Sequence, residues 1–294
     1  MSAPPPNSVT SSVPRALPAS SSWHLVLVLL TSALWSCADD ASSPDAAADA
    51  VAPDADAAPT ADAAATPDGT SGDPADAGPA LPSLDDEFDG TALASAWQRF
   101  RPELLDLAVS DGALHLTPNQ RVLWFDDSQG ALLYKRVTGD FKASTVVRAR
   151  RASDPAQAPT MTVHLGGIMA RAPTAVGDGG QEDYVFIVAG VDVDDLSVEV
   201  KTTDDGSSTF EGPTWGSPDA ALRLCRVGDE FRLYKRMPDQ GAWVQAASYT
   251  RPDMPATVQV GPIAYANTDT PDLRASFDYV RFAPVSDLAG CTAD

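Results

Sequence analysis

The sequence predicts an all-β fold, a sandwich of two antiparallel sheets, and two observations support this prediction. Short runs of alternating apolar and polar residues recur at even spacing between Leu84 and Phe282, separated by polar turn signals such as Ser110-Asp111-Gly112. No stretch of this region keeps a helical period. Many evenly spaced strands joined by polar turns are typical of an antiparallel sandwich or jelly roll.

The individual strands follow from this alternation and from the turn residues between them. In one run Phe231, Leu233 and Lys235 point to one face, and the residues between them point to the other. The expected strands lie near Leu105–Ser110, Ala113–Thr117, Ala131–Val137, Phe141–Arg151, Thr162–Ala170, Tyr184–Ala189, Ser197–Thr203, Ala221–Val227, Phe231–Arg236, Trp243–Tyr249, Val258–Ala264 and Arg274–Phe282.

The last of these strands carries bulky apolar groups on both faces, which is typical of an inner strand covered on both sides. It also contains an aspartate, Asp278. A carboxylate within such a strand is costly unless its charge is compensated. A backbone turn, an arginine or a bound cation are the three ways in which this compensation is expected.

Charge and composition divide the chain before the predicted sandwich. The 294 residues carry a formal net charge of −21, which argues against nucleic acid and anionic membrane surfaces as partners because both select basic patches. Residues 38–82 contain no charged residue other than Asp, no aromatic residue, and much Ala and Pro. Such a segment cannot bury enough apolar surface to fold, so we expect a disordered, extended linker. The expected organisation is a leader at 1–37, this linker at 38–82, the sandwich at 83–285 and a tail at 286–294.

The leader contains an apolar run from Leu25 to Leu34, which is too short to span a bilayer and fits the core of a signal peptide. Leu34-Trp35-Ser36-Cys37 resembles the lipobox of bacterial lipoproteins, in which the cysteine is lipidated. The resemblance implies a membrane-anchored protein of the bacterial cell envelope, at the outer membrane or the cell surface. The alternative is an ordinary cleaved signal peptide in which Cys37 has no role.

Three cysteines are present, and lipidation of Cys37 leaves Cys225 and Cys291. An exported chain meets an oxidising compartment, so this pair is expected to form a disulfide that holds the tail against a strand. The alternative is two free thiols.

Four stretches of the predicted sandwich resemble the concanavalin A-like (LamG-like) jelly rolls, a superfamily with legume lectins, laminin G modules and laminarinase-type glucanases. They are Asp86 to Gly90 with Trp97 after it, Ser110 to Leu116, Leu222 to Trp243, and Asp278 to Phe282. The order and spacing of these stretches carry the resemblance, which covers residues 84–283.

In the glucanase-like members of this superfamily a structural calcium ion joins the opening segment, the early hairpin and the last strand. The resemblance implies that Glu87, Gly112 and Asp278 supply oxygen ligands to such an ion. The alternative for Asp278 is a contact with a backbone amide or an arginine.

The catalytic motif of those glucanases is absent. They place two carboxylates and a third acidic residue on one strand, whereas the nearest stretch here is Asp192-Val193-Asp194-Asp195 with Glu199 further on. This stretch has the wrong spacing and is expected to form a turn. The histidines are isolated, and none has the spacing of a metal site.

A non-catalytic, lectin-like domain is therefore the favoured interpretation, with a carbohydrate or a cell-surface protein as its ligand. Trp124, Trp215, Tyr134 and Tyr184 are the candidate ligand-binding rings, because sugars stack on exposed aromatic side chains. The alternative for each is a place in the core, to which Trp97 and Trp243 are assigned. A diverged glycoside hydrolase and a purely structural envelope module are the alternative functions.

Overall fold

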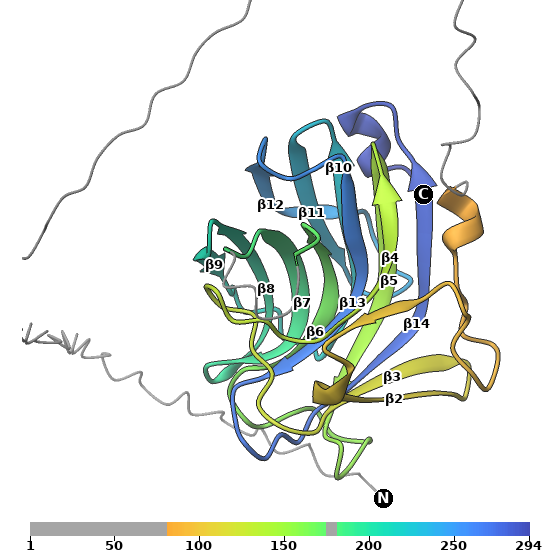
Figure 1. Cartoon of the computed structure of the whole chain (residues 1–294). Helices are drawn as coiled ribbons and strands as arrows, with labels where there is room; N and C mark the ends of the chain where they lie inside the picture. The colour runs from red at the N-terminus through yellow and green to blue at the C-terminus, as the bar shows by residue number, and fades with distance from the viewer. Residues whose placement is uncertain (1–80, 175–180) are drawn as a thin grey trace, which may run out of the picture. The chain divides into compact units, whose positions relative to one another are not determined.

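The computed structural model describes residues 81–174 and 181–294, so the predicted leader, Cys37 and nearly all of the predicted linker lie outside the described residues. The described part is a sandwich of two seven-stranded sheets, in which all pairs of neighbouring strands are antiparallel (Figure 1). This is the predicted all-β jelly-roll sandwich.

We call the two layers sheet I and sheet II. Across sheet I the strands are β1 (Gln98–Phe100), β4 (Leu132–Thr138), β13 (Thr257–Ala266), β6 (His164–Arg171), β7 (Tyr184–Asp192), β8 (Asp195–Asp204) and β9 (Ser207–Glu211). Across sheet II they are β12 (Val244–Thr250), β11 (Glu230–Arg236), β10 (Asp219–Val227), β5 (Phe141–Arg150), β14 (Arg274–Pro284), β3 (Ala113–Pro118) and β2 (Leu105–Ser110). Three short 3-10 turns complete the described residues: η2 (Leu81–Leu84), η3 (Pro102–Leu104) and η4 (Leu288–Cys291).

Every strand expected from the sequence is present, and the sequence missed two. The missed strands, β1 and β9, are short edge strands of three and five residues. β9 forms a hairpin with β8 through Asp205 and Gly206, whose φ angles of 47° and 71° give the left-handed turn that suits the twist of paired strands.

The main core lies between the sheets and follows the predicted alternation. On β8, Val198 and Val200 face this core, where they join residues of sheet II such as Leu222 and Leu224. Glu199 and Lys201 alternate with them and lie on the outer face of sheet I. Trp97 and Trp243 are both buried, as predicted.

The opening segment of the sandwich joins the closing strand. Asp86 and Val280 exchange backbone hydrogen bonds of 2.9 Å in both directions, and Phe282 donates its backbone N–H to the Asp85 carboxylate at 2.6 Å. Phe88 follows in the core and stacks on Trp97 with ring centroids 6.2 Å apart. The two ends of the predicted domain therefore meet in space.

The predicted disulfide is present. Cys225 on β10 is bonded to Cys291 in η4, at a sequence separation of 66. Both cysteines are buried in a small core on the outer face of sheet II, with Trp243 and Tyr234. The bond holds the tail (residues 286–294) against this face.

Within the described residues, none of the helical turns has the length and apolar character that crossing a bilayer requires.

Candidate functional site

The outer face of sheet I is covered by residues 119–131, which we call the covering loop. Val122 forms a backbone bridge to Ala266 at the end of β13, and Trp124 then inserts between the loop and the sheet. The Trp124 ring stacks on Phe100 at 6.2 Å and meets Tyr184 edge-on at 5.4 Å. Its indole N–H donates to the carbonyl oxygen of Ala131 at 3.2 Å, so the loop closes around its own aromatic residue.

This packing corrects the prediction of ligand-binding rings. Trp124 and Tyr184 are fully buried and Tyr134 is nearly so, and none of the three offers a ring face to a ligand. Trp215 is half-buried, donates its indole N–H to the Asp219 carbonyl oxygen at 3.0 Å, and has the Lys235 ammonium 5.0 Å from its ring. The alternative for these four residues was a place in the core, and Trp124, Tyr184 and Tyr134 have such a place.

The covering loop leaves one part of the face open as a pocket of about 350 Å³. The covering loop, the β7–β8 turn, β9 and the end of β13 surround it. Its lining residues are Leu123, Phe125, Ser128, Val163, Asp192, Val193, Glu199, Lys201, Phe210, Tyr265 and Asn267.

Lys201 forms the positive part of the pocket floor. Its ammonium donates to the carbonyl oxygen of Trp124 at 2.9 Å and lies 3.2 Å from Glu199 Oε1. Four ring centroids lie 4.9–5.5 Å from the same nitrogen, those of Phe125, Phe186, Phe210 and Tyr265. Cation–π attraction and the ion pair therefore fix this buried lysine in place.

Glu199 and Asp192 form the negative part of the floor. Burial raises the pKa of Glu199, and the neighbouring Lys201 opposes this shift. Burial also raises the pKa of Asp192. Glu199 Oε1 has an ion pair but no hydrogen bond to any of the described residues, so it is free to accept one from a ligand.

Two phenylalanines form the rim. Phe125 and Phe210 are 42 % and 47 % exposed, and their rings meet edge-on with centroids 6.1 Å apart. Ser208 connects their supporting segments, because its hydroxyl accepts from Asp126 N at 2.7 Å and its N–H donates to the Asp126 carboxylate at 3.0 Å. Sequence reasoning missed both rings. The signal available for Phe210 was a large apolar residue in a short polar segment, whereas Phe125 ends an apolar run and gave no such signal.

A second buried ion pair anchors the other end of the covering loop. Arg171 on β6 and Glu182 are both buried, and their side chains bond at 2.6 Å and 2.7 Å. Gln129 of the loop donates to the same carboxylate at 2.8 Å, and Arg101 donates to the Gln129 carbonyl oxygen at 2.7 Å. This network has no exposed surface at its centre, so its role is to hold the loop.

The three predicted calcium ligands lie in the opening segment, in the β2–β3 turn and on β14, and the two carboxylates among them have other partners. Asp278 accepts from the Arg148 guanidinium at 2.7 Å and 3.3 Å, and Glu87 accepts from Arg281 at 2.7 Å and 2.8 Å. The hydrogen bond from Arg281 lowers the pKa of Glu87. Gly112 lies in the β2–β3 turn with a φ of 71°.

The donor set therefore does not fit a calcium ion in this arrangement, because both carboxylates already neutralise guanidinium groups. The arginine contact that was the alternative for Asp278 is present. The calcium ion itself stays an untested prediction.

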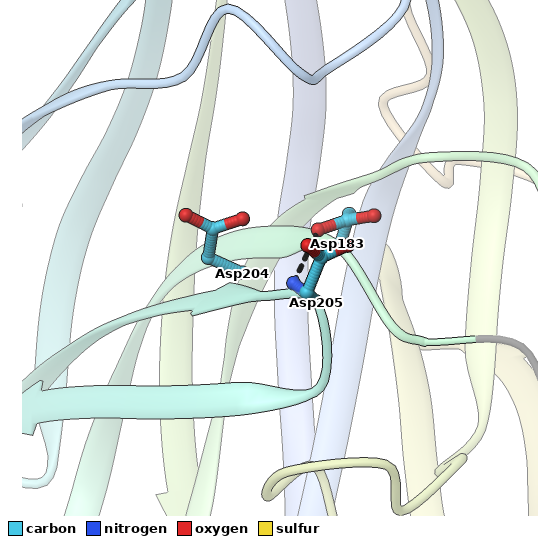
Figure 2. Close-up of side chains that lie close together, drawn as sticks. All are labelled: Asp183, Asp204 and Asp205. Carbon is cyan, nitrogen blue, oxygen red and sulfur yellow. Dashed lines mark hydrogen bonds between the residues drawn. The ribbon is translucent and has the colours of Figure 1, made fainter.

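Another acidic cluster consists of Asp183, Asp204 and Asp205, whose carboxylates lie close together (Figure 2). Asp183 accepts the backbone N–H of Asp205 at 2.9 Å and a hydrogen bond from Arg251 at 2.9 Å. Arg251 is buried and lies 3.8 Å from Asp204. Its guanidinium is thus the cation of this cluster.

The absence of the glucanase motif is consistent with the geometry of the stretch that was considered for it. Asp192 and Asp195 end and begin paired strands, and Val193 and Asp194 form the exposed turn between them. Asp194 points to solvent in this turn, whereas Glu199 lies in the pocket.

Comparison with known proteins agrees with the fold. No family model matches this chain, and no curated protein sequence matches it. Solved structures do match: a functionally unknown protein from Saccharomyces cerevisiae aligns with 14 % identity and a TM-score of 0.52, over 65 % of this chain and 97 % of that one.

Glycoside hydrolases also match. The GH43 BlXynB protein from Bacillus licheniformis aligns with 15 % identity and a TM-score of 0.55, over 68 % of this chain and 39 % of that one. A xylan β-1,4-xylosidase from Bacillus halodurans aligns with 15 % identity and a TM-score of 0.52, over 67 % and 38 %. This chain thus matches only about two fifths of these hydrolases, and the likeness concerns the fold.

Proposed function

We propose that this domain binds a carbohydrate in the pocket on the outer face of sheet I and does not cleave it. The observation that carries the proposal is the combination of two exposed phenylalanine rings with a buried, charged floor. Ligand sites of this kind combine apolar walls with a few convergent polar groups.

The chemistry of a sugar matches both parts of the pocket. The C–H face of a sugar ring packs on aromatic side chains, and Phe125 and Phe210 offer exposed ring surface at the rim. Sugar hydroxyls donate and accept hydrogen bonds, and the floor supplies both kinds of partner. Glu199 and Asp192 supply acceptors, and the Asn267 side chain supplies a donor and an acceptor.

The solved structures with this fold give further support, since several of them are named as glycoside hydrolases, one of them a xylan β-1,4-xylosidase. Xylo-oligosaccharides are therefore the first ligands to test. Cello- and laminari-oligosaccharides extend the test to β-linked glucans.

Binding is measured by isothermal titration of these saccharides into the purified full-length chain. Phe210→Ala removes one wall of the pocket, and we expect a loss of affinity of about tenfold, which corresponds to about 1.4 kcal/mol. The matched control is Val244→Ala, which truncates another exposed apolar side chain, on β12 of sheet II. Equal loss in both variants contradicts the assignment of the pocket, and binding of none of the saccharides by a folded chain favours a structural role.

A diverged glycoside hydrolase is the second candidate. Two carboxylates with raised pKa values, Glu199 and Asp192, share the pocket, and a protonated carboxylic acid is what general acid catalysis of glycoside cleavage requires. Release of reducing ends from the same saccharides tests this candidate. Activity that Glu199→Gln and Asp192→Asn abolish supports it, and intact saccharides after prolonged incubation exclude it for these substrates.

We also propose that the domain is displayed on the bacterial cell envelope by a lipid on Cys37. The motivation is the position of this cysteine directly after the apolar run and before the Asp-rich segment. Replacing Cys37 with Ser is expected to move the protein from the detergent phase to the aqueous phase in a Triton X-114 partition. Unchanged partitioning contradicts lipidation.

A further inference from the structure

A second pocket, of about 340 Å³, lies on the outer face of sheet II, on the opposite side of the sandwich from the sugar pocket. The strands β5, β10, β11 and β14 form its base, and the tail lies against the same face (Figure 1). It has none of its lining residues in common with the first pocket.

The charge of this second pocket is opposite to that of the chain. Its lining includes four cationic side chains, Lys142, Arg223, Arg236 and Arg281, and two carboxylates, Asp85 and Asp294. Glu87, outside the lining, pairs with Arg281, so four cations face three carboxylates. The whole chain has a net charge of −21, so an excess of positive charge in one hollow is unusual. Burial is the main cause that lowers the pKa values of Lys142 and Arg223, and a neighbouring guanidinium lowers each of them further, Arg223 in the first case and Arg236 in the second.

The pocket already holds a carboxylate of its own chain. The Asp294 side chain accepts from Trp243 Nε1 at 2.9 Å, from Arg236 Nη1 at 3.1 Å and from Arg223 Nη2 at 3.5 Å. The same side chain is 69 % exposed, so it lies at the mouth of the pocket. The donors are therefore arranged for a carboxylate, and the group that now uses them is open to exchange with solvent.

One donor in the pocket is unused. Arg236 Nε is buried and has no hydrogen-bond partner among the described residues. A buried N–H without a partner costs free energy, and a bound oxygen would relieve that cost. Arg236 Nη1 already donates to Asp294 at 3.1 Å and to the Gly241 carbonyl oxygen at 3.5 Å, so Nε is the donor that remains for a ligand oxygen.

Aromatic surface in the same pocket comes from Tyr279, which is half-buried, whereas Trp243 is buried and holds the guanidinium groups in place. The Trp243 ring lies 4.1 Å and 4.3 Å from the guanidinium carbons of Arg223 and Arg236, and the Tyr279 ring lies 4.0 Å from that of Arg281. Stacked guanidinium and aromatic planes bind a ligand that combines an anionic group with an apolar ring face. We propose that this pocket binds the carboxylate of an acidic sugar, which displaces Asp294 from Trp243 and Arg236.

The test is a titration of glucuronate into the purified full-length chain, with glucose as the neutral comparison and sulfate as the anion without a sugar ring. We expect glucuronate to bind, glucose to give no signal, sulfate to bind more weakly, and the glucuronate affinity to fall as salt is raised. Equal affinities for glucuronate and glucose, or for glucuronate and sulfate, overturn the assignment to an acidic sugar.

Two variants test the residues. Arg236→Met removes the unused donor and one stacked cation, and we expect the affinity for glucuronate to fall about tenfold or more. Asp294→Asn weakens the competing group, and we expect the affinity to rise about two- to fivefold, the range of an exposed ion pair. Arg121→Met is the matched control, since this half-exposed arginine pairs with Asp269 outside the pocket.

The proposal is overturned if Arg236→Met binds glucuronate as well as the unchanged chain, or if Asp294→Asn weakens binding. Phe210→Ala in the sugar pocket separates this site from the function proposed above. Unchanged glucuronate binding in that variant supports a second site, and loss of binding assigns the acidic sugar to sheet I and overturns the proposal.

Discussion

The two outer faces of the sandwich are both covered by a segment of the chain, but by different means. The covering loop on sheet I is held by aromatic packing around Trp124 and by the buried pair of Arg171 and Glu182, without a covalent bond. The tail on sheet II is held by the disulfide and by hydrogen bonds from Arg223 to the carbonyl oxygens of Cys291 and Ala293, at 2.9 Å and 2.8 Å.

This difference determines what each face leaves open. Covering sheet I with rings leaves an aromatic rim over one cation, Lys201, and two carboxylates, Glu199 and Asp192, which suits a ligand that is not an anion. Covering sheet II with a tail bound by cations leaves an excess of positive charge, which suits an anion. The same fold thus presents two pockets of similar volume whose lining residues differ in charge.

Removing the disulfide is expected to have the largest effect on this comparison. The bond closes a loop of 66 residues, and the double variant Cys225→Ala, Cys291→Ala should lose about 4 kcal/mol in free energy of unfolding, mainly through the unfolded state. Urea unfolding of the full-length chain measures the change.

The matched control is Cys37→Ser, which leaves the tail bonded. Mass mapping without reductant is expected to find the peptide pair that contains Cys225 and Cys291. If both thiols are alkylated without reductant, the disulfide is absent, and the tail on sheet II is not held by a covalent bond.

Truncating Trp124 is the corresponding change on sheet I. Trp124→Ala is expected to lose about 3 kcal/mol, because a fully buried indole leaves a cavity that the covering loop cannot fill. The loop should then become open to limited proteolysis, whereas the tail stays bonded. Trp215→Ala is the control, since this ring is half-buried, and it should lose clearly less stability. Equal losses would show that Trp124 does not anchor the loop.

The strands could be predicted because they depend on local alternation of apolar and polar residues. The disulfide could be predicted from the number of cysteines. Alternation along β8 already places Val198 and Glu199 on opposite faces. The pairing of Cys225 and Cys291 followed from an odd number of cysteines and one candidate for lipidation. Neither inference needs to know which segments pack on the outer faces.

The pocket could not be predicted for that reason. Alternation indicates which face of the sheet a side chain points to, but it does not indicate whether another segment of the chain covers that face. Trp124 lies outside the strands and was a candidate ligand-binding ring, with a place in the core as the alternative, and the covering loop folds it inward. Phe210 lies on β9, one of the two strands that the sequence did not indicate, and this strand presents it to solvent beside Phe125.

The two faces are also expected to differ in how a carboxylate on each of them makes stability depend on pH. The pKa of Glu199 in the folded chain is raised by burial above the unfolded value of 4.5, so the unfolded state releases its proton first as the pH rises through that value. Stability therefore falls with rising pH between 4.5 and the higher pKa of the folded state, by at most about 1.4 kcal/mol per pH unit. Glu199→Gln removes this slope, so the variant should gain stability relative to the unchanged chain as the pH rises.

Glu230 on the outer face of sheet II is the matched control. The hydrogen bond from Ser248 is the first cause that lowers its pKa below 4.5, so it stabilises the folded state above that value and less as the pH falls. Glu230→Gln should therefore lose relative stability as the pH rises through this window. Urea unfolding across about pH 3 to 7 measures both slopes, and slopes of the same sign would contradict the assignment.

Chelation is expected to have the smallest effect and concerns the cations of sheet II. On this side Arg148 and Arg281 neutralise Asp278 and Glu87, the two carboxylates that the resemblance assigned to calcium. If guanidinium groups are the only cations there, EDTA should leave the melting temperature of the full-length chain unchanged, because removing an ion that does not bind changes no equilibrium.

Arg281→Gln makes this measurement decisive, since it frees Glu87 to act as an oxygen ligand beside Asp278 and Gly112. An unchanged melting temperature in calcium for both forms supports arginine as the cation on sheet II. A fall in EDTA that calcium restores in the unchanged chain would show that the ion binds despite the ion pairs. The two faces would then differ also in a bound metal ion, which sheet II would have.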